Sequence, residues 1–295
     1  MKKIGYKART KFWNTLIMVF IGIVCVIFTI PILLIVSASF TSSKALADIG
    51  YRLIPPQFSA EAYQYLLHDP SMVTQAYGVS IYITVVGVVV GVLIMAMLAY
   101  VLSRKEFKLR GFLTFYIFFT MLFNGGLVPY YINMVRVLHL KDTLTSLILP
   151  GLVVPFFVLL LRTYFSTLPK ELIDSARIDG ANEFTIFFQI ALPLSMPAVL
   201  TIALFLMLNY WNDVFQALLF IENNKLSPLQ YTLYKMIVNT EFLSSGEGVS
   251  AGMVVPVLSV RMAMAVLALG PIILAFLFVQ RYFVRGITLG SIKGD

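Results

Sequence analysis

The sequence predicts an all-α integral membrane protein with six transmembrane helices. Of its 295 residues, 59% are hydrophobic and 12% are charged, and the mean hydropathy is +0.89. This apolar surface is too large for one soluble core. The apolar residues fall into six long runs separated by polar segments. The single cysteine, Cys25, lies within the first run, so an internal disulfide is impossible and we expect the thiol to be inert packing.

The six runs form one membrane domain that covers residues 1–295. The expected spans are residues 14–38, 77–103, 111–134, 143–165, 197–221 and 262–284. The first run follows a basic head and is longer than the apolar core of a signal peptide, so we interpret it as an uncleaved span. The second run carries Gly87 and Gly91, a spacing that lets another helix approach closely.

Polar and helix-breaking residues interrupt two of the runs. In the third run, Asn124, Gly125 and Gly126 precede Pro129, which predicts either a lining of the translocation pathway or a helix kink with packing glycines. The fifth run contains an aromatic and amide cluster, which is expected either to orient a substrate or to anchor and pack the helix. The candidate pathway residues are Asn124, Gly125, Asn209, Tyr210, Trp211, Asn212 and Asp213.

Between the fourth and fifth runs, residues 166–196 form a polar loop that predicts two short helices. Pro169 suits the start of the first helix, in which Leu172 and Ala176 share a face. Gly180 is expected to end that helix in a left-handed conformation, and Asn182 is expected to cap the second. Four apolar residues of the second helix should then form one stripe at helical spacing: Phe184, Phe187, Phe188 and Ala191.

The residues of this loop resemble the EAA loop of ATP-binding-cassette (ABC) importer permeases. In that motif Glu-Ala-Ala is followed by three residues, a glycine, nine residues and Ile-x-Leu-Pro. Gly180, Ile190, Leu192 and Pro193 stand at this spacing, whereas Asp174 and Ser175 replace the glutamate and the first alanine. The substitutions keep the charge and the small size. An interfacial helix pair lying on the lipid surface is the alternative reading of the loop.

The resemblance implies a type I ABC importer permease fold with a cytoplasmic coupling-helix loop that docks into a separate ATPase. The docking residues that it implies are Glu171, Leu172, Asp174, Ser175, Ala176, Asp179, Gly180, Phe184, Phe187, Phe188, Ile190, Leu192 and Pro193. Similarity extends over essentially the whole chain to the carbohydrate-uptake (maltose-type, MalG-like) branch, including residues 99–104 and 211–212. Residues 123–129 and 137–140 look like the LplC/YtcP-type subgroup, which is associated with complex oligosaccharides.

Basic residues predict the topology. With six spans, the side that holds both termini and loop 166–196 carries 14 basic residues, or 15 with Arg162, and the other side carries seven. Basic residues accumulate in the cytoplasm, so both termini and the loop are expected inside a bacterial cytoplasmic membrane, with loops 39–76, 135–142 and 222–261 outside. In the last outer loop, a flexible segment is a candidate contact for a binding protein: Ser244, Ser245, Gly246, Glu247 and Gly248.

The sequence contains no phosphate-binding loop, zinc-protease motif or nucleophile elbow. We therefore expect no enzyme activity and no cofactor in this chain, with Mg-ATP bound by the partner ATPase. The two histidines, His68 and His139, have no neighbouring ligands in the sequence, which argues against a metal site. The resemblance implies a second homologous permease, two ATPase subunits, an extracytoplasmic binding protein and transport by alternating access.

Two other functions remain open from the residues alone. An ion-coupled secondary transporter or channel usually needs ionisable residues within its spans. Here these are Asp213 and Arg162, toward opposite ends of their spans, and Arg281 at the end of the last span. A membrane scaffold that transports nothing would require the cavity residues to be irrelevant. Binding to nucleic acid is not expected, because the excess of basic residues in a membrane protein indicates its topology.

Overall fold

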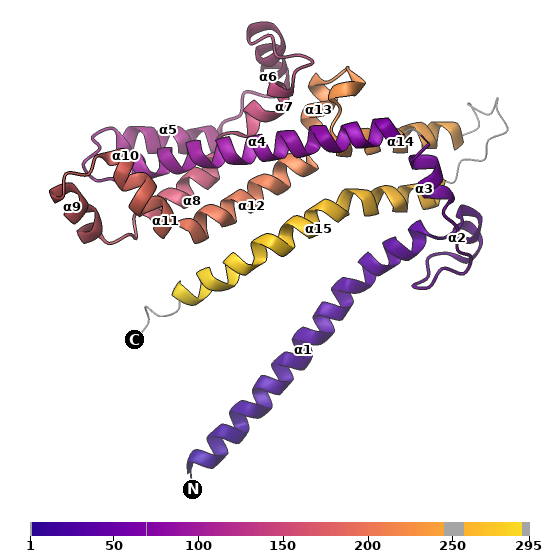
Figure 1. The fold of residues 1–295 in the computed structure, drawn as a ribbon, viewed down its shortest axis with the longest axis horizontal. Helices are drawn as coiled ribbons and strands as arrows, with labels where there is room; N and C mark the ends of the chain where they lie inside the picture. Colours follow the sequence, from indigo (N-terminus) through magenta and orange to yellow (C-terminus); the bar gives the residue numbers. More distant parts are fainter. Residues whose placement is uncertain (1, 69, 245–256, 291–295) are drawn as a thin grey trace. The chain divides into compact units, whose positions relative to one another are not determined.

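The computed structural model describes residues 2–68, 70–244 and 257–290, with side chains for 13–68, 70–239, 257–274, 276 and 277. The described residues are mostly helical and contain no strand, apart from an isolated bridge between Thr41 and Phe58 (Figure 1). Three of the helices are long and apolar enough to cross a membrane, and the number rises to six if each of three bent helix pairs is one span. The predicted all-α membrane fold is therefore confirmed.

The chain divides into two compact units, Met1–Pro70 with Met236–Gly270 and Ser71–Lys235 with Pro271–Asp295. The first unit contains α1 (Lys2–Ser39), α2 (Ser43–Ile49), α3 (Glu61–Leu66) and the first part of α15 (Val257–Gly290). Helix α1 continues through Pro31, and Cys25 on it is exposed rather than packed in a core. The exposed apolar surface of α1 suits contact with lipid. The apolar run around Cys25 therefore did not imply that its thiol is buried within the protein.

The segment between α1 and α3 is held by hydroxyl groups and an aromatic cluster. Ser42 caps α2 by accepting a hydrogen bond from the Ala45 amide, and the Ser43 hydroxyl lies 2.7 Å from the Ser259 hydroxyl. Phe40 packs against Phe58 and Tyr63. The expected outer loop of residues 39–76 is thus partly helical.

The remaining helices lie in the second unit, except for Pro70 at the start of α4 and the part of α14 from Met236 onward, which belong to the first unit. Helix α4 begins seven residues earlier than expected, at a proline that suits a first turn. The first elements of the second unit are α4 (Pro70–Ser103), α5 (Arg110–Leu122), α6 (Leu127–Ile132), the π-helix η1 (Asn133–Val137), α7 (Leu144–Ile148), the 3₁₀-helix η2 (Leu149–Gly151) and α8 (Pro155–Phe165). These are followed by α9 (Lys170–Ile178), α10 (Glu183–Ile186), the π-helix η3 (Phe187–Ala191), α11 (Leu192–Leu194), α12 (Met196–Asn212), α13 (Phe215–Phe220), the 3₁₀-helix η4 (Asn224–Leu226) and α14 (Leu229–Ser244). Helix α8 contacts both α5 and α12.

The two spaced glycines of α4 form a close helix contact, as predicted. A Cβ at Gly87 would collide with the Tyr210 ring of α12, and a Cβ at Gly91 would lie 3.0 Å from a methyl group of Leu206. Gly151 of η2 borders the same ring, because a Cβ there would lie 2.7 Å from the Tyr210 hydroxyl. Tyr210 is 4% exposed, and its hydroxyl donates to the carbonyl oxygen of Ile148 at 2.7 Å.

Two of the predicted runs are not single straight helices. The third run bends by 113° between α5 and α6–η1, where Gly126 adopts a φ of +89°. Gly125 does not pack against a helix, because a Cβ at this position would meet nothing within 4 Å. The fifth run is not one helix: α12 ends at Asn212, and the Asp213 carboxylate accepts the Gln216 amide and starts α13.

The expected outer loop of residues 222–261 also contains structure. Helix α14 occupies Leu229–Ser244, and its first residues are buried beside α4, where the Ser80 hydroxyl accepts the Leu229 amide. Tyr231 packs with Ile83 and Leu147 in a small apolar cluster. These buried contacts provide the stabilisation that the polar composition of the loop did not suggest.

Candidate functional site

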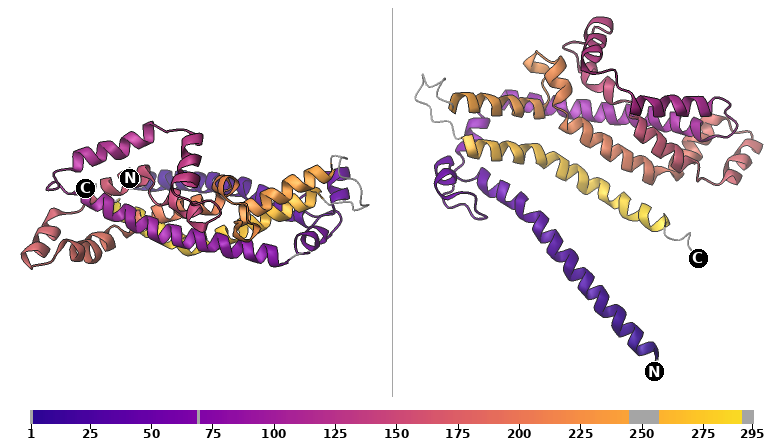
Figure 2. Two further views of the ribbon diagram at one scale, coloured as in Figure 1. Left: turned by 90° about the horizontal axis from the view of Figure 1, so that it is seen from above. Right: turned by 180° about the vertical axis from the view of Figure 1, so that it is seen from behind.

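A glycine turn separates α9 from α10 at one end of the second unit (Figures 1 and 2). Gly180 has a φ of +83°, as the sequence predicted. Its amide donates to the Arg177 carbonyl at 3.0 Å, and the Ala181 amide donates to the Ala176 carbonyl at 2.9 Å. This pair of bonds is a Schellman motif, which satisfies the last carbonyl groups of a helix and reverses the chain.

The second helix begins at the predicted cap. The Asn182 side chain accepts the Thr185 amide at 2.8 Å, and Glu183 occupies the first turn, where a carboxylate is favourable. The two helices of the loop are therefore fixed by local bonds on both sides of Gly180. A second bend of 81° separates α10–α11 from α12.

The predicted apolar stripe of this helix is wrong. Phe187 and Ala191 are buried, at 3% and 0% exposure, whereas Phe184 and Phe188 are exposed at 68% and 44%. The reason is η3: a π-helix has a wider turn than an α-helix, so the spacing of three and four residues no longer selects one face. Ile186 takes a place in the buried face instead.

The first helix of the loop also has two faces. Ile173 and Ala176 are buried, and Leu172 is exposed. Leu172 and Ala176 nevertheless line one open groove of about 430 Å³ between α9 and η3–α11. The groove brings together six of the predicted docking residues with Gln189 and Leu194, and its lining is Leu172, Ser175, Ala176, Asp179, Gln189, Ile190, Pro193 and Leu194.

Large apolar side chains are exposed on this otherwise polar loop. We call this set the apolar patch: Leu172, Ile178, Phe184, Phe188 and Leu194. Ile178 is 86% exposed and was not among the predicted docking residues. Its place beside the helix-ending Asp179 and Gly180 was the available signal, because an apolar residue there has no core to enter.

The predicted residues Glu171, Asp174, Ser175 and Asp179 are also exposed, while Leu192 is partly buried against the core. Of these polar side chains, Ser175 and Asp179 line the groove. The structure thus places exposed acidic side chains and the apolar patch on the same loop.

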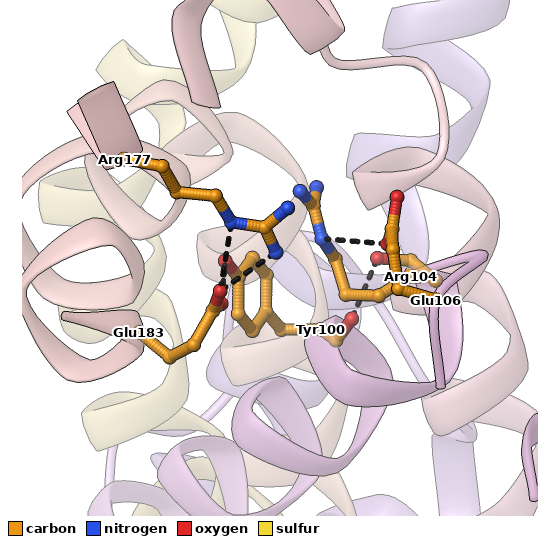
Figure 3. Close-up of polar contacts among 6 residues, drawn as sticks. Tyr100, Arg104, Glu106, Arg177 and Glu183 are labelled. Carbon is orange, nitrogen blue, oxygen red and sulfur yellow. Dashed lines mark hydrogen bonds and ion pairs between the residues drawn. The ribbon is translucent and has the colours of Figure 1, made fainter. Parts of the chain in front are cut away.

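A polar network joins the loop to the end of α4 (Figure 3). Glu183 Oε1 accepts hydrogen bonds from Arg177 Nε at 3.0 Å and Nη2 at 2.7 Å, and Glu183 Oε2 accepts one from the Tyr100 hydroxyl at 3.0 Å. The bond to Glu183 raises the pKa of the Arg177 guanidinium. Arg104 lies over the Tyr100 ring, with its guanidinium carbon 5.4 Å from the centroid. No pattern in the sequence indicates the bond between Tyr100 and Glu183, because these residues are 83 positions apart in the chain.

Some of the candidate pathway residues line two cavities, and the others do not. Asn209 and Asp213 line a cavity of about 120 Å³ with Tyr210 and Gln216. Asn124 lines an adjacent cavity of about 440 Å³ with Gly126, Leu127, Tyr130, Pro150, Phe215 and Gln216. Pro150 and Gln216 border both cavities, and the Tyr130 hydroxyl donates to Gln216 Oε1 at 2.6 Å. Gln216, Tyr130 and Phe215 were not predicted.

Three candidates have other surroundings. Trp211 is 6% exposed and packs against Tyr77 at a centroid distance of 6.4 Å. The Asn212 side chain donates to the Leu208 carbonyl of its own helix, and Gly125 lines neither cavity. Of the predicted binding-protein contact, Ser244 ends α14, and Ser245, Gly246, Glu247 and Gly248 lie outside the described residues.

The described residues contain no group of three or more metal-ligating side chains. An apolar helical body, cavities lined in part by polar groups and a loop with exposed apolar side chains are features of a membrane transport subunit that works with other proteins.

The comparisons with known proteins agree. The family described as "Binding-protein-dependent transport system inner membrane component" matches residues 87–289, and the chain belongs to this family. It is 37% identical over 275 residues to protein LplC of Bacillus subtilis (strain 168), covering 93% of this chain and 92% of LplC. It is also 34% identical to the polygalacturonan/rhamnogalacturonan transport system permease protein YtcP of the same organism, over 97% of this chain and all of YtcP.

An arabinooligosaccharides permease, AraQ of Halalkalibacterium halodurans, is 32% identical over 90% of this chain and 91% of AraQ. Among solved structures, a bacterial ABC transporter involved in the import of the acidic polysaccharide alginate matches with a TM-score of 0.78 and 31% identity. That match covers 92% of this chain and 97% of the other. The chain is thus an ABC importer permease subunit, a membrane protein and not an enzyme, and this family function favours a solute-binding protein and an ATPase as its partners.

Proposed function

We propose that this chain is one of two homologous permeases of an ABC importer that moves an oligosaccharide into a bacterial cell by alternating access. Loop 166–196, here called the coupling loop, docks into a dimer of ATPase subunits that bind Mg-ATP. ATP acts by favouring one of two global states of the assembly. The termini and the coupling loop are cytoplasmic, and a binding protein delivers substrate from the other side.

The apolar patch is the observation that carries this proposal. Ile178 and Phe184, exposed at 86% and 68%, stand on a loop whose neighbours Glu171, Asp174 and Asp179 are exposed and charged. Exposed apolar groups rimmed by polar ones are typical of protein interaction sites. The Schellman turn and the Asn182 cap fix the two helices that carry the patch, so it is presented to a partner with little loss of conformational freedom.

The substrate class rests on the relatives and on the cavities. YtcP and AraQ are named for the transport of polygalacturonan or rhamnogalacturonan and of arabinooligosaccharides. The cavities of this chain combine amides, a carboxylate and hydroxyl groups with the rings of Tyr130 and Phe215. Convergent polar groups beside aromatic faces suit the hydroxyl groups and apolar faces of sugars.

Replacing exposed patch residues tests the docking. We expect Ile178→Ser and Phe184→Ser to leave normal amounts of permease in the membrane but to reduce the affinity for the ATPase. Burial of either apolar side chain in the docked state contributes about 1.5–3 kcal/mol to binding. Loss of this contribution should raise the dissociation constant for the ATPase at least about tenfold. The readout is the amount of ATPase that remains bound when the importer is purified through a tag on this chain.

Ile54→Ser is the matched control, because Ile54 is 80% exposed in the first unit and outside the coupling loop. It should retain the ATPase at the wild-type level. Full retention in both patch variants would contradict the proposal and favour a helix pair that braces the lipid surface.

A further inference from the structure

We infer that Glu183 is a positioning residue, which fastens the coupling loop to the end of α4 so that the two move as one body. The inference rests on the proposed function, because it assigns the mechanical link that a docking loop needs. Glu183 belongs to α10, Arg177 to α9 and Tyr100 to α4. One carboxylate therefore joins three helices, with a different oxygen for each neighbouring element (Figure 3).

The α4 end of this link is rigid. Tyr100 is 4% exposed, and its ring packs against Phe165 at 5.9 Å and Phe187 at 5.3 Å between centroids. The Arg104 guanidinium covers the ring as well. The Tyr100 hydroxyl is thus held at a fixed place, and the hydrogen bond that it donates fixes the position of the Glu183 carboxylate.

The other end of the link holds the glycine turn. Arg177 is the residue whose carbonyl accepts the Gly180 amide, and its guanidinium makes two hydrogen bonds to one oxygen of Glu183. The ion pair spans the turn, so it sets the angle between α9 and α10. Apolar contacts such as that of Phe187 with Tyr100 are not directional and allow sliding, whereas charge-assisted hydrogen bonds fix a geometry.

Helix α4 extends the link to the cavities. Residue Gly87 of α4 receives the Tyr210 ring, and Tyr210 lines the smaller cavity. A displacement of the coupling loop is therefore passed through Glu183 and Tyr100 to α4 and from there to α12. Packed helices transmit displacement because protein interiors are dense and resist compression.

Spin-label distances in the full chain test the link without any partner. The labels are attached at Lys105→Cys and Asp174→Cys, two exposed positions on the α4 side and on α9, in a Cys25→Ser background. We expect one narrow distance in the parent and a broad distribution in Tyr100→Phe and in Glu183→Gln. The double variant should be no broader than either single variant, because both remove the same link.

Tyr210→Phe is the control in the spin-label measurement. It removes the hydroxyl of an equally buried tyrosine, which donates a hydrogen bond to Ile148 and not to Glu183. It should keep the narrow distance. An unchanged narrow distance in both Tyr100→Phe and Glu183→Gln would overturn the inference.

A second readout separates positioning from plain stability. In the importer purified through a tag on this chain, Tyr100→Phe removes only the α4 end of the link and leaves the Arg177–Glu183 ion pair of the coupling loop in place. This variant should keep the ATPase bound and its basal ATP hydrolysis, but lose stimulation by the loaded binding protein. A Tyr100→Phe importer with full stimulation would overturn the inference. Failure of the wild-type chain to retain any ATPase would instead refute the docking proposal and leave the distance result to decide the role of Glu183.

Discussion

Replacing Gly180 by valine perturbs the turn of the coupling loop and little else. Gly180 has a φ of +83°, and a Cβ at this position would meet nothing within 4 Å. The effect of a side chain is therefore backbone strain without a steric clash. A left-handed non-glycine residue costs roughly 1–2 kcal/mol.

This strain is similar to what holds the turn closed. The two Schellman hydrogen bonds contribute about 0.5–1.5 kcal/mol each, and strain of 1–2 kcal/mol shifts an equilibrium by roughly 5- to 30-fold. We therefore expect Gly180→Val to open the turn in a large fraction of molecules while the membrane helices remain intact. Gly180→Asn should have a smaller effect, because asparagine tolerates the left-handed region.

The assay measures membrane abundance, ATPase retention and substrate uptake in one preparation. Gly180→Val should reach normal abundance and lose either ATPase retention or uptake. Gly50→Val is the matched control, because Gly50 ends α2 with a φ of +81° and also has no neighbour within 4 Å of an added Cβ. If Gly180→Val retains the ATPase and transports fully, then the angle at the turn does not matter, and Gly180 is a plain linker.

Two further predictions concern packing and pH. Gly87→Ala should lower the thermal stability of the purified permease, because overpacking against the Tyr210 ring costs roughly 1–3 kcal/mol. Gly78→Ala is the control on the same helix, because a Cβ there meets nothing within 4 Å. Equal melting temperatures of the two variants would refute the close contact at Gly87. Asp142 accepts the backbone amides of residues 223 and 222, which lowers its pKa. Because the pKa of Asp142 is lowered in the folded state, these bonds stabilise the loop at pH values above the ordinary carboxyl pKa of about 3.9. The stabilisation is lost as the pH falls through the folded pKa. Hydrogen exchange of the two amides should accelerate over that range in the wild type but not in Asp142→Asn, and an identical pH profile in both would contradict this role.

Local backbone features of the loop could be predicted from the sequence. Gly180 and Asn182 are chemically suited to a left-handed stop and a helix cap, and each acts through hydrogen bonds to residues within six positions in the chain. The close approach at Gly87 and Gly91 was likewise evident from their spacing. Features of this kind depend on near neighbours, and the residues themselves determine them.

The remaining features depend on tertiary contacts. The prediction of which face of the second loop helix is buried was wrong, because the wide π turn arises where Ile186, Phe187 and Ala191 pack into the core. The Glu183 link joins residues 83 positions apart, and no periodicity indicates it. Gln216 lines both cavities only because Asp213 ends α12 and turns the chain.

Because of the π turn of η3, the number of residues between Gly180 and Pro193 determines how the faces of this segment are oriented around the helix axis. Each residue of an α-helix turns the chain by about 100°. The wider turn of η3 contains one more residue than an α-helical turn, so the residues after it are rotated less than they would be in a continuous α-helix. Removing a single residue between Phe187 and Ala191 would let this segment close into an ordinary helix, and Phe184 would then be rotated relative to Pro193. A chain of fixed length between the glycine and the proline thus keeps one edge of the helix in the core and the opposite edge facing outward.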